Sequence, residues 1–108
     1  MGAPDVELRW WEGCPSTERA RAELREVLDR LGLADVEIRM REVGGDEEAR
    51  AMRFPGSPTI LIDGRDVVTP SADEPIGLTC RVYRRRDGEV SPTPDPADLR
   101  AAIQEVIK

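Results

Sequence analysis

The pattern of apolar and polar positions predicts a β-strand and then an amphipathic helix at the start of the chain. Val6, Leu8 and Trp10 alternate with charged residues, which is typical of a half-buried strand over residues 5–10. Five apolar positions then recur at helical spacing before Gly32: Ala20, Leu24, Val27, Leu28 and Leu31. Because proline is tolerated at the first helical position, we expect the helix to open at Cys14-Pro15-Ser16-Thr17.

The middle of the chain predicts two further strands and a short helix between them. Apolar and charged residues alternate again over residues 35–42, and Asp46 can cap a helix that runs to about Arg53. The apolar run from Pro58 to Asp63 is typical of a buried strand. Asp63-Gly64 then signals a hairpin into Val67-Val68.

Residues 70–96 differ from the rest of the chain and are expected to form an irregular insertion. They hold most of the prolines, yet Cys80 to Arg84 is strand-like and Asp87-Gly88 can turn that stretch back on itself. A last amphipathic helix is predicted from Pro96 to Ile107.

The order of these elements predicts the fold class. A strand–helix–strand unit implies a parallel pair with a right-handed crossover, and the hairpin adds an antiparallel pair to the same sheet. We therefore expect an α/β fold in which a small, mixed, four-stranded sheet has helices on both faces. The length of 108 residues suits one domain over residues 1–108.

Composition narrows the function classes. Twenty-two acidic residues against 16 basic ones give a net charge of −6, which argues against a nucleic-acid partner. The chain has no histidine, which excludes imidazole bases and histidine-ligated metals, and two cysteines are too few for an all-cysteine zinc site. Charged residues near the start and the lack of a long apolar run predict a cytoplasmic protein without a signal peptide or membrane segment. We expect no metal and no cofactor.

Cys14 is the first candidate for chemistry. A thiol at the start of a helix meets unpaired backbone N–H groups and the positive end of the helix dipole, and both favour the thiolate. Thr17, one turn later, can donate its hydroxyl to the sulfur. The alternative is that Cys14 is a small buried apolar residue, as many free cysteines are.

Two short motifs give the chain a resemblance to the thioredoxin superfamily. Gly13-Cys14-Pro15-Ser16-Thr17 follows a strand and opens a helix, and Gly56-Ser57-Pro58-Thr59 opens a buried strand. The resemblance covers residues 5–69 and the last helix, and is nearest to small bacterial thioredoxin-like proteins. The stretch from Gly77 to Tyr83 weakly resembles cysteine motifs of alkylmercury-lyase-like proteins.

From its place after the alternating strand, Trp11 is expected beside Cys14 as an apolar wall, and a merely packed indole is the alternative. The resemblance implies that Cys14 would attack a disulfide with Pro15 beside it, and that Pro58 would follow a cis peptide bond. The backbone N–H and C=O of Ser57 would then be free to pair with an extended substrate. The sequence departs from the dithiol members because Thr17 stands where they have a second cysteine, so no disulfide can form within the motif.

Cys80 is the one other cysteine and therefore the one internal candidate for a resolving thiol. The hairpin at Asp63-Gly64 turns the chain back toward the edge that carries Cys14, so the two thiols can lie near each other. The alternative is a core cysteine on a strand beside Val82.

Three functions follow from these residues. The leading hypothesis is a thiol–disulfide oxidoreductase whose partners are protein or small-molecule thiols and disulfides. One alternative is a thioredoxin-fold adaptor module whose cysteines do not turn over. Another is capture of mercury or copper(I) by the thiolates of Cys14 and Cys80.

Overall fold

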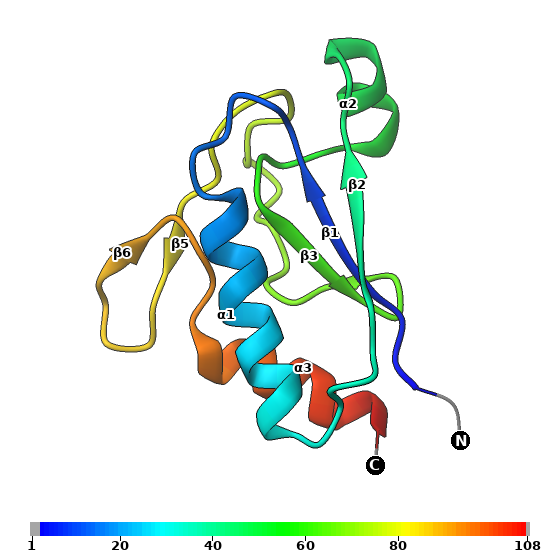
Figure 1. The fold of residues 1–108 in the computed structure, drawn as a ribbon. Helices are drawn as coiled ribbons and strands as arrows, with labels where there is room; N and C mark the ends of the chain where they lie inside the picture. Colours follow the sequence, from blue (N-terminus) through cyan, green and yellow to red (C-terminus); the bar gives the residue numbers. More distant parts are fainter. Residues whose placement is uncertain (1–2, 108) are drawn as a thin grey trace.

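The alternating segment near the start of the chain forms the central region of a four-stranded sheet with strand order β2-β1-β3-β4. The computed structural model describes residues 3–107 (Figure 1). Strand β1 (Val6–Trp10) pairs in parallel with β2 (Ile38–Glu42) and antiparallel with β3 (Thr59–Ile62). Strand β4 (Arg65–Asp66) pairs antiparallel with β3. The predicted α/β class and the mixed four-stranded sheet are confirmed.

The predicted hairpin between β3 and β4 is present and has a two-residue loop. Asp63 and Gly64 have φ angles of 52° and 82°, as the tight hairpin turn with left-handed central residues requires. The pairing of Ile62 with Arg65 and of Leu61 with Asp66 follows from this turn. Asp66 therefore lies on the same face of the sheet as Leu61.

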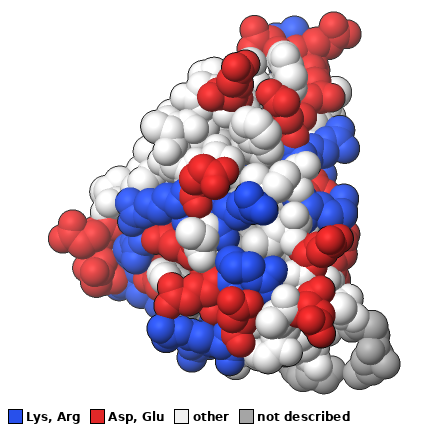
Figure 2. All heavy atoms as spheres, viewed as in Figure 1, with Lys and Arg blue, Asp and Glu red and all other residues white. Residues whose placement is uncertain are grey.

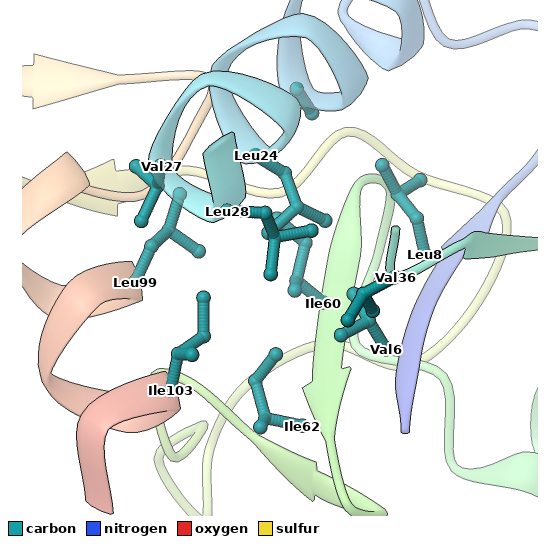
Figure 3. Packing of buried hydrophobic residues seen from close by; sticks show 11 residues of the cluster. Val6, Leu8, Leu24, Val27, Leu28, Val36, Ile60, Ile62, Leu99 and Ile103 are labelled. Atoms are coloured by element: carbon teal, nitrogen blue, oxygen red, sulfur yellow. The ribbon is translucent and has the colours of Figure 1, made fainter. Parts of the chain in front are cut away.

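Two helices, α1 (Thr17–Arg30) and α3 (Pro96–Ile107), cover one face of the sheet. Their apolar residues interdigitate with the inward residues of β1 and β3, as Figure 3 shows. The fully or nearly buried members of this cluster are Val6, Leu8, Ala20, Leu24, Val27, Leu28, Val36, Ile60, Ile62, Leu99 and Ile103.

The opposite face of the sheet does not carry the expected helix. Helix α2 (Asp46–Met52) lies beyond the carboxyl end of β2, where Ala49 packs with Val43 and Phe54 in a separate small cluster. The residues that point to this second face include buried Glu7, which is ion-paired with Arg9 and Arg39. Such a polar face cannot accept the apolar stripe of a helix, so the expectation of helices on both faces is wrong.

The insertion contains a short hairpin, β5 (Tyr83–Arg84) and β6 (Val90–Ser91), close to its predicted place. The expected strand from Cys80 to Arg84 is correct only for its last two residues. Cys80 itself forms an isolated bridge with Ser57 and does not join the hairpin.

Charged side chains are unevenly distributed over the surface. In the view of Figure 2, acidic residues gather at the top, where Figure 1 has α2, while acidic and basic residues alternate over α1. The first turn of α2 carries Asp46, Glu47 and Glu48, a favourable arrangement at the positive end of a helix dipole. Within residues 3–107, none of the helices combines the length and apolar character needed to cross a bilayer.

The packing in Figure 3 predicts a large cost for a cavity at Leu24, which is 0 % exposed. Leu24→Ala should lower the free energy of unfolding by about 2–5 kcal/mol, measured by urea denaturation. The matched change Val90→Ala, at a residue that is 60 % exposed, should alter it by no more than about 0.5 kcal/mol. Equal effects of the two substitutions would contradict this account of the core.

Candidate functional site

The two motifs singled out in the sequence meet at one end of the sheet. Arg9 of β1 is paired with Thr59 of β3, so Pro58 lies at the end of the sheet where β1 finishes. The Ser57–Pro58 peptide bond is cis. The loop that carries Cys14 leaves β1 at this same end (Figure 1).

Cys14 lies in a turn that precedes the helix, and this corrects the expected helix start. Its backbone N–H donates to the carbonyl oxygen of Trp11 at 3.0 Å. The cap of α1 is Ser16, whose carbonyl oxygen accepts the N–H of Ala20 at 3.0 Å, and the helix begins at Thr17. Pro15 is therefore not the first helical residue, and Cys14 lies two positions before the cap. The thiol is outside the first helical turn because the Trp11–Cys14 turn uses the residues just before it.

The hydroxyl of Thr17 also differs from its expected role. It donates to the carbonyl oxygen of Cys14 at 3.5 Å and not to the sulfur. Thr17 is buried, and Cys14 is only 8 % exposed. Thr17 therefore fixes the backbone of the turn that holds the thiol.

The backbone of Ser57 is not free, contrary to expectation. We call residues 77–81 the strap, because they run alongside residues 54–57 and pair with them. The N–H of Ser57 donates to the carbonyl oxygen of Thr79, and the C=O of Ser57 accepts the N–H of Arg81, both at 2.8 Å. The chain itself thus occupies both groups that the resemblance assigns to a substrate.

Cys80 lies between the two strap residues that pair with Ser57. It is exposed, and both cysteines are free thiols. The alternative of a core cysteine beside Val82 is wrong, since Val82 is exposed as well. The inward position in this stretch belongs to Arg81, so the alternation is shifted by one residue from the one expected.

Trp11 connects the Cys14 loop to the strap. Its indole Nε1 donates to the carbonyl oxygen of Thr79 at 3.1 Å, the same oxygen that accepts the N–H of Ser57. The ring also lies over Gly13, where a Cβ atom would come within 2.2 Å of it. Glycine is thus required at position 13 so that the indole can reach the strap.

Arg81 fastens the strap to the sheet. Its guanidinium is almost fully buried and donates from Nη1 to Asp66 Oδ2 at 2.8 Å and to Thr59 Oγ1 at 3.1 Å. Nη2 donates to the carbonyl oxygen of Val68 at 2.6 Å, and Glu74 Oε1 lies 3.7 Å from Nε. These contacts pair the buried charge and satisfy both terminal nitrogens, while Nε is buried without a hydrogen-bond partner.

Tyr83 completes this attachment. The guanidinium carbon of Arg81 lies 4.6 Å from the centre of the tyrosine ring, a cation–π arrangement. The hydroxyl of Tyr83 donates to the carbonyl oxygen of Pro58. The strap and its continuation therefore contact all three residues from Ser57 to Thr59.

Burial shifts the titration of two groups in this network. It raises the pKa of the Asp66 carboxyl, and the positive charge of Arg81 opposes that rise. Burial likewise raises the pKa of the Tyr83 hydroxyl, which stays protonated and can donate to Pro58. The network thus has one buried cation facing Asp66 and, at a longer distance, Glu74.

Sequence reasoning missed the residues that hold the strap. Asp66 could have been found, because its place two residues after Asp63-Gly64 sets it opposite Leu61 on a buried strand. Nothing in the local pattern distinguishes Arg81 from the three arginines at residues 84–86. Within residues 3–107, no three potential metal-ligating side chains form a group. Comparisons with protein-family models, curated proteins and solved structures give no match.

The buried ion pair predicts that Arg81→Ala is strongly destabilising. The substitution leaves Asp66 buried without its cation, so the free energy of unfolding should fall by about 3–5 kcal/mol. Arg30→Ala is the matched control, because Arg30 pairs with Glu26 on the exposed face of α1 and should cost about 0–1 kcal/mol. Urea denaturation of both variants checks the prediction, and a similar small cost for each would contradict it.

The two adjacent tryptophans offer a second comparison. Trp11→Phe removes the hydrogen bond to Thr79 and should lower the free energy of unfolding by about 0.5–1.5 kcal/mol. Trp10→Phe is the control, because Nε1 of Trp10 is buried without a partner and no hydrogen bond is lost. Urea denaturation followed by circular dichroism measures both, and a larger loss for Trp10→Phe would refute the role given to Trp11.

Proposed function

We propose that this protein is a thioredoxin-like thiol–disulfide oxidoreductase in which Cys14 and Cys80 are the reacting pair. The strand order, the mixed pairing and the helix that follows β1 are compatible with a thioredoxin-like fold. The position of Pro58, at the end of the sheet that carries the Cys14 loop, adds to this support.

The carbonyl oxygen of Thr79 is the observation that carries the proposal. It accepts one hydrogen bond from Ser57 N–H at 2.8 Å and another from the indole of Trp11 at 3.1 Å. Trp11 begins the turn that ends at Cys14, and Thr79 directly precedes Cys80. This shared acceptor joins the two segments that carry the only cysteines of the chain.

The proposed reaction has two exchange steps. The thiolate of Cys14 attacks one sulfur of a substrate disulfide, so that a mixed disulfide forms and one substrate thiolate leaves. The thiolate of Cys80 then attacks the sulfur of Cys14 and releases the second substrate thiolate. One disulfide is broken in the substrate and one forms between Cys14 and Cys80, so the substrate is reduced by two electrons and the protein is oxidised by two.

The test is to treat the reduced protein with oxidised glutathione in the presence of a metal chelator and to map the products by mass spectrometry. The wild type should lose both thiols together and form an intramolecular disulfide. Cys80→Ser should instead retain one glutathione on Cys14, because the mixed disulfide has no internal thiol to resolve it.

A displaced cysteine provides the matched control. Ser71 is exposed on the same insertion. Ser71→Cys combined with Cys80→Ser therefore places the second thiol at residue 71 instead of residue 80. The Cys14 adduct should persist much longer in this variant than in the wild type. Rapid resolution by the displaced thiol, dimers formed through Cys14 alone, or no adduct on Cys14 would each overturn the pairing of Cys14 with Cys80.

A further inference from the structure

We infer that the strap restricts this thiol chemistry to small disulfides, because it occupies the backbone groups with which an extended polypeptide would pair beside Cys14. The inference rests on the proposed function and adds the class of substrate. It concerns the access of a disulfide to the Cys14 thiol.

The strap occupies the main-chain groups of Ser57. An extended peptide is held on a β-edge by hydrogen bonds to free N–H and C=O groups. At Ser57 both groups are used by Thr79 and Arg81 at 2.8 Å, and Ser57 is 0 % exposed. A polypeptide substrate therefore finds no free main-chain partner there.

The strap is firmly attached to the sheet. Moving it away from Ser57 would draw Arg81 out of its contacts with Asp66, Thr59 and Val68. The strap also packs tightly against residue 56. A Cβ atom added to Gly56 would lie 3.2 Å from Arg81 and from the side chain of Thr79. A peptide would have to replace all of these contacts in order to bind in place of the strap.

The Cys14 thiol itself has little exposed surface. Cys14 is 8 % exposed, and the adjoining turn is covered by the indole of Trp11, which packs on Gly13. A small disulfide needs only the sulfur atom and a short approach path. A cysteine within a folded or extended chain also brings its flanking residues against the surface around this barely exposed sulfur.

The experiment measures the first exchange step in the Cys80→Ser background, so that only Cys14 can react. One probe is bis(2-hydroxyethyl) disulfide. The other is a short extended peptide whose central cysteine is joined to the same small thiol, so that both probes are uncharged at the disulfide. With the small probe, the Cys14 thiolate forms one new disulfide and one 2-mercaptoethanol thiolate leaves. With the peptide probe, attack on the cysteine sulfur leaves the peptide on Cys14 and releases 2-mercaptoethanol, whereas attack on the other sulfur releases the peptide thiol. Mass spectrometry of the Cys14 adduct separates the two paths, and the rate constant for the peptide counts only the first.

Selectivity is the second-order rate constant with the small disulfide divided by the one with the peptide. This ratio is then divided by the same ratio measured with N-acetylcysteine as the attacking thiol. With the strap intact we expect a normalised preference for the small disulfide of at least about tenfold, because the residues that flank the peptide cysteine meet the strap and the Trp11 indole at a thiol that is only 8 % exposed. Gly56→Ala, which crowds the strap, should reduce this preference. Asp66→Asn, which weakens the attachment of Arg81, should do the same.

The outcomes separate the two proposals. A folded protein whose Cys14 reacts with neither probe would overturn the proposed function. Reaction with both probes at a normalised ratio near one would overturn the restriction and leave the function standing. If both loosening variants fail to fold, a normalised ratio near one with the intact strap still overturns the restriction. A preference that persists unchanged in folded loosened variants would show that the strap is not its cause.

Discussion

The buried pairing of Arg81 with Asp66 is the interaction on which the arrangement of this protein depends. Asp66 lies just beyond the β3–β4 turn, and Arg81 comes from an irregular segment with little regular structure of its own. A guanidinium that is 2 % exposed must be satisfied by partners within the protein, and Asp66, Thr59 and Val68 provide them. Their positions therefore determine where the strap lies.

This anchor is one part of the difference between the two faces of the sheet. One face is covered by α1 and α3 through an apolar cluster, in the usual manner of an α/β fold. The other carries buried Glu7 with its arginines and, near β4, the contacts of Arg81. Ion pairs and hydrogen bonds are directional, so this second face fixes the position of a single segment more narrowly than an apolar contact would.

The consequence for the candidate site is that the chain covers its own sheet end. Ser57 has its backbone groups satisfied, as buried groups generally must be, by a segment that belongs to the same molecule. The same segment exposes Cys80 and meets the Cys14 loop through Trp11. Coverage of Ser57 and the contact between the strap and the Cys14 loop are thus two results of one attachment, and a change in Arg81 should affect both.

The sequence alone determined the elements whose signals are local. Alternation marked β1, the turn pair Asp63-Gly64 marked the β3–β4 hairpin, and apolar spacing marked the two long helices. The start of α1 was misplaced by two residues because a proline after a cysteine fits both a turn and a first helical position. Only the tertiary structure decided the place of the strap, because its contacts join residues far apart in the chain. The hydrogen-bond partners of the Arg81 side chain lie 13 to 22 residues away, and no local pattern encodes a pairing over that distance.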